Sequence, residues 1–241
     1  RGRRVEAVLR RAKMLVLRLS GHRFLAFHLK MTGQLVYAPP HGRRVSGGHP
    51  IPNLGVLPNQ FTHVIFRFRD GGTLYLNDQR KFGWVRFVDL DGLHRLTAHL
   101  GAEPLSAAFT AQYFRRVARR YPNRAIKSVL MDNALLVGVG NIYADEICFC
   151  AGIRPTRRVR RITDAQLTKL YRYIPRVLKL ALRHKGTTQD TYRRINGQSG
   201  YHASFLNVYG RKGQPCKRCA TLIVRTVVGQ RGTHYCPRCQ R

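Results

Sequence analysis

The segment CKRCATLIVRTVVGQRGTHYCPRC, residues 216–239, contains two Cys-x-x-Cys pairs separated by sixteen residues. Each short pair can close a knuckle, and the residues between them suit a hairpin that carries the second pair opposite the first. Four thiolates leave no open coordination position, so the spacing predicts one structural zinc ion bound by Cys216, Cys219, Cys236 and Cys239. Disulfides are the alternative, but six cysteines in a chain of this length without a secretory signal do not resemble a secreted disulfide framework.

The rest of the chain is as basic as this segment. Its 241 residues include 44 Lys and Arg against 11 Asp and Glu, a formal net charge of +33. This excess indicates a polyanionic partner, and nucleic acid is the first candidate. A membrane-surface protein is the weaker alternative, because its charge usually gathers in one cluster or on one amphipathic helix. No run of eighteen apolar residues and no signal peptide occurs, so we expect a cytoplasmic protein without a membrane partner.

Residues 211–241 contain eight Lys or Arg and no acid. Arg231 falls near the expected hairpin tip. This is the pattern of a phosphate-binding module, although a merely solvated basic face is the alternative.

The first hundred residues are predicted to be mostly antiparallel β. Residues 12–37 are rich in β-branched and aromatic residues and contain turn signals. Residues 38–60 carry five prolines, which indicates a loop. Residues 63–78 alternate apolar and polar positions about Asp70-Gly71-Gly72, which predicts a hairpin, and residues 82–90 add a strand.

The pattern becomes helical after residue 100. Ser106 is the expected N-cap of the first helix, and two short helices are expected within residues 123–133 and 141–152. Thr163 is the expected N-cap of a longer helix with apolar residues at i, i+3, i+4 and i+7.

The turn before Asn141 contains glycines, and free N–H groups at a helix start can bind a phosphate. Asn141 acting only as a helix cap is an equal alternative. Asp145 and Glu146 are expected in the first turn of this helix, where acids are favoured. No spacing among the acids or histidines announces a hydrolase, a two-metal nuclease or a catalytic triad. The residues alone therefore predict a zinc-containing nucleic-acid-binding protein.

Several stretches together resemble the bacterial formamidopyrimidine-DNA glycosylase family, in order and at appropriate spacing. They are RRAKMLVLRL (10–19), HLKMTGQL (28–35), NDQRKFGWVRF (77–87), LGAEPLS (100–106), IKSVLMDNALLVGVGNIYADEICFCAGIRP (126–155), GTTQDTYRRINGQSGYHASFLNVYGRKGQPC (186–216) and the cysteine segment. The resemblance covers nearly the whole chain.

This resemblance implies an α+β, multidomain fold with an antiparallel β-sandwich, a helix-two-turn-helix domain and a C-terminal zinc finger hairpin. We expect them at residues 1–100, 101–205 and 206–241. It implies a monomeric DNA repair glycosylase and AP lyase that removes oxidised purines, such as 8-oxoguanine and formamidopyrimidines, from damaged double-stranded DNA by base flipping.

The resemblance also implies roles for single residues. Met31, Arg80 and Phe82 would fill the space left by the flipped nucleotide, with Arg80 bonding the orphaned cytosine. Without the resemblance, Met31 and Phe82 would be interpreted as ordinary core residues.

Five further residues are expected, by resemblance, at the backbone of the DNA. Lys13, Asn141 and Arg231 would contact the phosphates that flank the lesion, and Lys127 and His28 are further expected contacts. Lys13 and Glu146 would support the chemistry, and residues 193–202 would cover the extruded base.

One departure concerns the nucleophile. Family members begin, after Met removal, with Pro-Glu, whose secondary amine attacks the sugar and whose carboxylate moves protons. Aligning Lys13 leads us to expect that about forty residues, with the first helix and strand, precede Arg1 in a parent protein. We therefore expect a fragment of an active enzyme, and the alternative is a remnant that binds DNA without cutting it. In either case we expect DNA binding without base excision, exposed apolar sheet surface and low solubility.

Two other functions are alternatives. One is an endonuclease-VIII-like glycosylase for oxidised pyrimidines. The other is a non-catalytic zinc-ribbon DNA-binding protein, which would explain the cysteines and the charge but not the NDQRKFGW and VGVGNIYADE segments. A redox dithiol protein is a third, and bound zinc would dismiss it.

Overall fold

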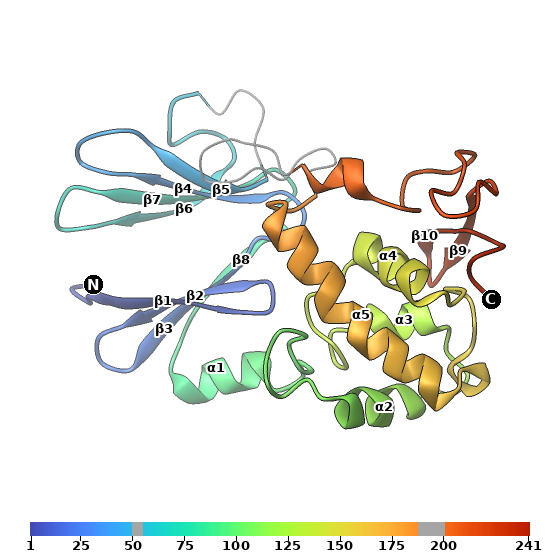
Figure 1. The fold of residues 1–241 in the computed structure, drawn as a ribbon. Coiled ribbons are helices and arrows are strands. Elements are labelled where there is room, and N and C mark those ends of the chain that lie inside the picture. The colour runs from blue at the N-terminus through green and yellow to red at the C-terminus, as the bar shows by residue number, and fades with distance from the viewer. Residues whose placement is uncertain (50–54, 188–200) are drawn as a thin grey trace. The chain divides into compact units, whose positions relative to one another are not determined.

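The computed structural model describes residues 1–49, 55–187 and 201–241. Its contacts divide the chain into two compact units, which Figure 1 shows as mainly strand and mainly helix. The first unit is Arg1–Ala98 with Lys185–Ala203, and the second is His99–His184 with Ser204–Arg241.

The first unit contains two antiparallel four-stranded sheets. One has the order β1-β2-β3-β8, formed by β1 (Val5–Arg11), β2 (Met14–Leu19), β3 (Arg23–His28) and β8 (Trp84–Val88). The other has the order β5-β4-β7-β6, formed by β5 (Val45–Gly48), β4 (Gly33–Ala38), β7 (Thr73–Asp78) and β6 (Thr62–Arg67).

A small apolar core joins the two sheets. Leu17 and Phe27 of the first sheet are buried and belong to one cluster with Leu35, Phe66 and Leu74 of the second. Phe27 and Phe66 meet edge to face with ring centroids 5.7 Å apart. Two antiparallel sheets sharing a core form a sandwich, which confirms the predicted architecture of this unit.

Three elements of this unit differ from the sequence prediction. Strand β1 lies before the expected start of the sheet, and β5 lies inside the segment predicted to be a loop. Helix α1 (Leu90–Thr97) begins where a strand was expected to end, because the Asp89 carboxylate caps it by accepting from the Gly92 N–H at 2.8 Å.

The second unit is a helical domain followed by a hairpin. Its helices are α2 (Ala111–Arg119), α3 (Ile126–Leu130), α4 (Asn141–Ala151), the 3-10 turn η1 (Val159–Arg161) and α5 (Asp164–Arg183). The strands β9 (Val224–Val228) and β10 (Arg231–Tyr235) form the hairpin. A further 3-10 turn, η2 (His202–Phe205), begins in the first unit and ends in the second. These elements complete the predicted mixed fold with antiparallel sheets.

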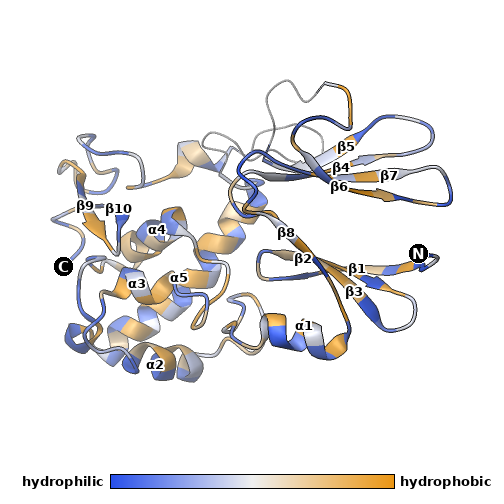
Figure 2. Cartoon of the chain, turned by 180° about the vertical axis from the view of Figure 1, so that it is seen from behind, coloured by the Kyte–Doolittle hydropathy of each residue, from blue (hydrophilic) through white to orange (hydrophobic). Residues whose placement is uncertain are grey.

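The longest helix confirms its predicted cap. The Thr163 hydroxyl accepts from the Gln166 N–H, and the Gln166 side chain accepts from the Thr163 N–H, which is a complete capping box. Leu167, Leu170 and Ile174 are buried in the helical core, and Figure 2 shows hydrophobic and hydrophilic residues alternating along α5.

The cap predicted for the first helix of this unit is wrong. Thr110, not Ser106, precedes α2 and accepts from the Tyr113 N–H at 3.0 Å. Ser106 instead belongs to the turn before it, where its hydroxyl donates to the Glu103 carbonyl.

Among the described residues, none of the helices has both the length and the apolar character of a membrane span.

Candidate nucleic-acid interface

The four predicted zinc ligands come together at one point of the second unit. The Sγ atoms of Cys216, Cys219, Cys236 and Cys239 all lie within 4.8 Å of one another. Three Sγ–Sγ pairs are separated by 3.3 to 3.9 Å, close to the ~3.8 Å edge of a tetrahedron with zinc–sulfur bonds of about 2.3 Å. These separations are too long for disulfides, so the cysteines fit one structural zinc ion.

Backbone N–H groups support this cysteine cluster. The N–H of Arg218 points at Cys216 Sγ and that of Cys239 points at Cys236 Sγ, each at 3.4 Å. Cys216 and Cys236 are buried against Phe149 of α4. The metal site therefore attaches the β9–β10 hairpin to the helical domain.

The tip of the hairpin is attached at a second point, by Lys127 of α3. The Lys127 ammonium donates to the Gly232 carbonyl at 3.0 Å and the Thr233 hydroxyl at 2.8 Å, and pairs with the Asp145 carboxylate at 2.7 Å. Lys127 and Asp145 are both fully buried. All three donors of this ammonium are used inside the protein. Lys127 is therefore buried against the hairpin and does not lie at the surface, where a direct phosphate contact was expected.

Helix α4 begins beside this hairpin tip. Gly140 is its N-cap residue and Asn141 its first residue, so the alternative in which the Asn141 side chain caps the helix is not what the structure has. The Asn141 amide donates to the Gly232 carbonyl at 3.1 Å, which brings Asn141 next to Arg231.

The backbone in front of α4 is open. Gly138 has a φ of +88°, which favours glycine, and a Cβ placed on Gly138 or Gly140 would meet no atom within 4 Å. The first N–H groups of a helix have no intrahelical acceptor, so this end of α4 can hold an anion.

The sequence predicted Asp145 and Glu146 in the first turn of α4, and this prediction is wrong. Both are buried one turn further along the helix. Asp145 accepts from the His234 N–H at 2.8 Å. Glu146 accepts from the N–H groups of residues 207–209, at distances of 2.8 to 3.0 Å. These carboxylates hold the hairpin and the preceding loop against α4, which is a stronger constraint than a dipole interaction.

The first unit displays the predicted space-filling residues on its surface. Met31 is 57% exposed and Phe82 is 52% exposed, so the interpretation as core residues is wrong. The Arg80 guanidinium lies 4.7 Å from the centroid of the Phe82 ring, and its Nη1 lies 3.8 Å from Met31 Sδ. Met31 lies in the turn between β3 and β4, and Arg80 and Phe82 lie in the turn between β7 and β8. The two turns thus present one cluster of two apolar side chains and one cationic side chain.

Asp78, at the end of β7, holds these two turns together. Its carboxylate accepts from the Arg80 N–H at 3.1 Å, the Gly83 N–H at 2.6 Å and the Thr32 hydroxyl. Burial raises the pKa of Asp78, but these hydrogen bonds outweigh it and hold that pKa below its ordinary value. The sequence predictions did not include this role, although an Asp side chain that accepts from the backbone N–H two residues on is typical of a turn.

His28 and Lys13 lie near each other in the same unit, where β2 pairs with β3. Burial, followed by the charges of Lys30 and Lys13, lowers the pKa of His28 to about 4, so the ring is neutral at pH 7. Its Nδ1 accepts from the Lys30 N–H at 3.0 Å, which leaves Nε2–H as the donor.

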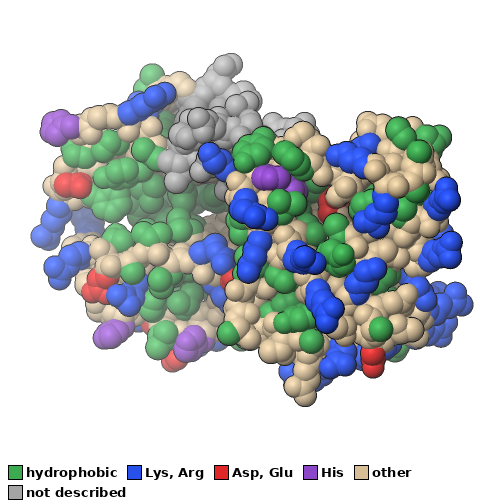
Figure 3. Space-filling model, in the orientation of Figure 1, with side chains coloured by type: hydrophobic (Ala, Val, Ile, Leu, Met, Phe, Trp, Pro, Cys, Tyr) green, Lys and Arg blue, Asp and Glu red, His purple; other side chains and the backbone are tan. Residues whose placement is uncertain are grey.

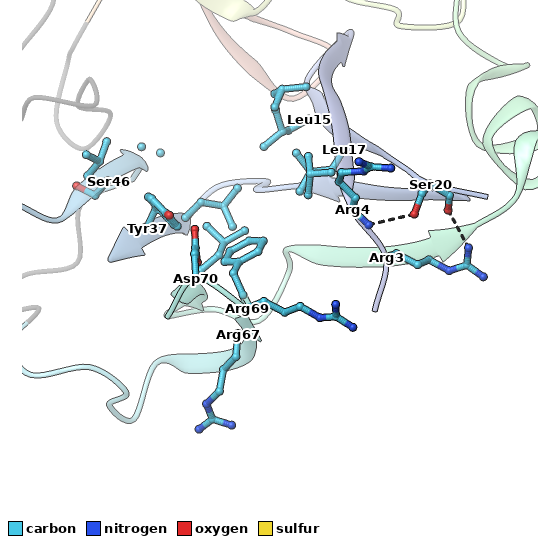
Figure 4. Close-up of a pocket in the computed structure, with 18 of the residues that line it drawn as sticks. Arg3, Arg4, Leu15, Leu17, Ser20, Tyr37, Ser46, Arg67, Arg69 and Asp70 are labelled. Carbon is cyan, nitrogen blue, oxygen red and sulfur yellow. Dashed lines mark hydrogen bonds between the residues drawn. The ribbon is translucent and has the colours of Figure 1, made fainter. Parts of the chain in front are cut away.

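A groove of about 1170 Å³ lies between the two sheets of the first unit. Figure 4 shows Leu15 and Leu17 on one wall, Tyr37 on the other, and the hydrogen bonds of Arg3 and Arg4 with Ser20. Val8 of β1, 65% exposed, adds to this apolar surface. This sandwich therefore exposes apolar surface along β1 and the groove.

The two remaining cysteines are inert. Burial raises the pKa of Cys148 and of Cys150, the latter to about 11, so neither forms a thiolate near neutral pH.

The loop predicted to cover the extruded base is residues 193–202, and its residues 193–200 lie outside the described residues.

Family models match three successive parts of the chain. The formamidopyrimidine-DNA glycosylase N-terminal domain matches residues 1–85, and the formamidopyrimidine-DNA glycosylase H2TH domain matches residues 100–193. A zinc finger found in FPG and IleRS matches residues 213–241. A lone zinc ribbon would match only the last of these, so that alternative is wrong.

Related proteins match over the whole chain. It is 41% identical over 240 residues to the formamidopyrimidine-DNA glycosylase of Roseiflexus sp. (strain RS-1), covering 100% of this chain and 82% of that protein. It is 44% identical to the formamidopyrimidine-DNA glycosylase of Alcanivorax borkumensis, covering 98% of this chain and 82% of that protein.

Solved structures match as well. The Lactococcus lactis Fpg bound to DNA with an abasic site is similar with a TM-score of 0.83 at 29% identity, covering 100% of this chain and 83% of that one. MutM (Fpg) from Thermus thermophilus gives a TM-score of 0.82 at 37% identity, covering 99% and 84%. The chain therefore belongs to the formamidopyrimidine-DNA glycosylase family of DNA glycosylases and AP lyases.

Proposed function

We propose that this chain recognises oxidised purines in damaged double-stranded DNA by flipping the damaged nucleotide out of the helix. The observation that carries this proposal is the exposed cluster of Met31, Arg80 and Phe82. Exposed apolar side chains that lie together, beside a cation, are typical of an interaction site, and similar proteins have been solved with abasic-site and Fapy-dG DNA.

The cluster suits the space that a flipped nucleotide leaves. Apolar side chains such as Met31 and Phe82 can enter between base steps and replace the lost stacking. The Arg80 guanidinium, held over the Phe82 ring, carries donors that can bond the acceptors of the unpaired cytosine. Asp78 orients this cluster through the backbone of the 79–83 turn.

The backbone of the DNA would be held at phosphates next to the lesion. The open N-terminus of α4 at Asn141, with Arg231 beside it, supplies N–H groups and a charge for one phosphate. Lys13 and the Nε2–H of His28 supply donors in the sheet domain. Lys127 and Glu146 act as positioning residues, because their contacts fix the hairpin tip and the 207–209 loop.

The zinc ion held by Cys216, Cys219, Cys236 and Cys239 would be structural. When bound, it pins the two ends of the hairpin and keeps Arg231 at the start of α4.

The excision step needs an amine nucleophile, and no Pro-Glu pair occurs in residues 1–241. Lys13 and Glu146 could support the chemistry, but neither replaces that amine. The Glu146 carboxylate is buried and already accepts hydrogen bonds from the backbone N–H groups of Val208 and Tyr209. We therefore assign DNA binding to these residues and expect no base excision from them alone. We further propose that the domains are residues 1–100, 101–205 and 206–241, and that the protein acts as a monomer on DNA in the bacterial cytoplasm.

The test is a binding and cleavage assay with the purified 241-residue chain. Duplexes carry 8-oxoguanine opposite cytosine, an abasic-site analogue, an oxidised pyrimidine, or no lesion. We expect tighter binding to the 8-oxoguanine and abasic duplexes than to the intact one, and no product from any of them.

A matched control separates the cluster from general apolar surface. Phe82→Ala should weaken lesion binding by about tenfold, since stacking is worth about 1–3 kcal/mol. Phe87→Ala, an equally exposed phenylalanine on β8, should not. Equal affinity for all four duplexes would overturn the proposal. Preference for the pyrimidine lesion would move the substrate to the endonuclease-VIII-like class, and excision by the chain would refute the assignment of the nucleophile.

A further inference from the structure

A second concave basic site lies in the second unit, beside the C-terminal knuckle of the zinc finger. A cavity of about 700 Å³ is lined by Arg154, Arg157, Arg158, Arg160, Arg161 and Arg241, with Thr156 as the only other lining residue. This volume is within the usual range of ligand pockets. A cavity lined by six arginines and one threonine concentrates positive potential, so it favours a ligand with several negative charges.

Two of these arginines are fixed by the zinc finger. The Arg154 guanidinium lies 5.4 Å from the Tyr235 ring centroid and donates to the Pro237 carbonyl at 3.4 Å. Arg157 Nη1 donates to the Arg241 carbonyl at 3.2 Å. The Nε of Arg154 is buried without any hydrogen-bond partner among the described residues, which leaves a donor unsatisfied in the protein alone.

Three further lining arginines are exposed. Arg158 is the N-cap residue of η1, and Arg160 and Arg161 lie within it. Among the parts of the chain that the structure describes, no acid pairs with them. Two acids close to this turn are taken, because Asp132 pairs with Arg124 and Asp164 pairs with Arg119, at 2.8 and 2.7 Å. Figure 3 shows how few acidic side chains interrupt the Lys and Arg on the face it displays.

This site is separate from the proposed phosphate site at Asn141. Asn141 begins α4 and Arg154 follows its end, and the eleven residues of α4 span about 16 Å. The N–H groups that would hold a phosphate point outward from the first end, so the arginine cavity lies at the end of α4 that faces away from that phosphate. Arginine near a helix C-terminus is stabilising, but this explains Arg154 and not the five others.

We propose that this cavity binds the phosphodiester backbone of a second DNA segment, so that the protein holds two segments at once. Guanidinium groups bind phosphate oxygens with two parallel hydrogen bonds, and a row of them suits a chain of phosphates. The cavity has no aromatic lining residue on which a base could stack, so the contact would be independent of sequence.

The test uses the zinc-loaded 241-residue chain and two labelled duplexes. The first carries an abasic-site analogue and is present at saturation, and the second is undamaged and is titrated while energy transfer between the two is measured. The pocket variant is Arg158→Ala, Arg160→Ala and Arg161→Ala. The control variant, Arg115→Ala, Arg116→Ala and Arg120→Ala, removes the same charge from exposed positions on or next to α2.

We expect the unchanged chain and the control variant to bind the second duplex with saturation. The pocket variant should bind the second duplex at least tenfold more weakly. The slope of log K against the logarithm of the salt concentration should become shallower by about three. Binding of the first duplex by the pocket variant should change by less than twofold. Lesion preference is scored on the first duplex alone, so a failure of the proposed function is distinguishable from a failure here.

Three results would overturn the proposal. The unchanged chain could bind no second duplex, or the pocket variant could bind it as well as the unchanged chain, or both variants could lose it equally. Sodium tripolyphosphate is titrated in parallel by calorimetry. If it binds in an arginine-dependent manner while the second duplex does not, the cavity serves a small polyphosphate and the assignment to DNA is wrong.

Discussion

At the scale of single residues, the buried pair of Lys127 and Asp145 has the largest predicted effect. Replacing Lys127 by Met leaves the Asp145 carboxylate buried without its cation, and such a loss costs about 3–5 kcal/mol. The free energy of unfolding, measured in urea, should fall by that amount. The double variant Lys127→Met, Asp145→Asn should recover most of it, because the amide oxygen can still accept from the His234 N–H. A double variant no more stable than the single one would contradict this account.

Asp78 predicts a pH dependence of the sheet domain. Its pKa in the folded protein lies below its ordinary value, so the folded state binds fewer protons than the unfolded state in the range between the two values. The stabilisation is therefore present above about pH 4, the unperturbed value for Asp, and is lost as pH falls through the folded pKa.

The single tryptophan, Trp84 in β8, reports on this domain. Urea midpoints followed by its fluorescence should fall with pH in the original chain. They should fall less steeply in Asp78→Asn, which starts lower by about 1–3 kcal/mol because a donor now faces backbone N–H groups. Parallel curves for the two proteins would show that Asp78 is not the titrating group.

Residue identity predicted the zinc ligands but not the surroundings of Met31 and Phe82. Four cysteines with fixed spacing are constrained by coordination chemistry, so sequence suffices. A methionine and a phenylalanine beside strands have no such constraint, and their exposure depends on the Asp78 turn and the absence of a covering segment among the described residues.

At the scale of elements, the hairpin depends on the metal. Structural zinc contributes about 10–16 kcal/mol in small zinc-finger peptides, so its removal should release β9 and β10. Arg231 would then leave the start of α4, and DNA affinity should drop by at least tenfold, while the apolar helical core keeps its helix signal in circular dichroism. Zinc returned after chelation should restore binding. Unchanged affinity in the zinc-free protein would contradict the role of the hairpin.

Strand β1 and the groove beside it predict that the 241-residue chain self-associates when no DNA is bound, whereas the form proposed to act on DNA is a monomer. Val8 is 65% exposed and borders the groove of the first unit. Val8→Thr should shift the chain toward the monomer in size-exclusion chromatography, whereas Val227→Thr, a valine that is 60% exposed on β9, should not. If the two variants elute alike, the groove is not the associating surface.

Elements with strong local signals were predicted well. The helix after Thr163 combines a cap with regular apolar spacing, and both act locally. Strands β1 and β5 were missed because VEAVLRR does not alternate and VSGG lacks strand-forming residues, so their structure comes from pairing with β2 and β4.

At the scale of the whole molecule, we propose that Met31 and Phe82 of the sheet domain enter a DNA duplex whose phosphates the helical domain and the zinc finger hold. Sequence predicted a nucleic-acid partner from charge alone, since +33 is a global property. It did not predict the Lys127–Asp145 and Glu146 contacts that join α3, α4 and the hairpin, because they link residues far apart in the chain.

The most direct measurement is the fluorescence of 2-aminopurine placed next to an abasic-site analogue in a duplex, since this base brightens when it is unstacked. Binding of the unchanged chain should raise the fluorescence. Met31→Ala with Phe82→Ala should bind through the same phosphates but raise it far less, and Phe87→Ala should behave as the unchanged chain. A double variant that raises the fluorescence as strongly as the unchanged chain would contradict insertion by these side chains.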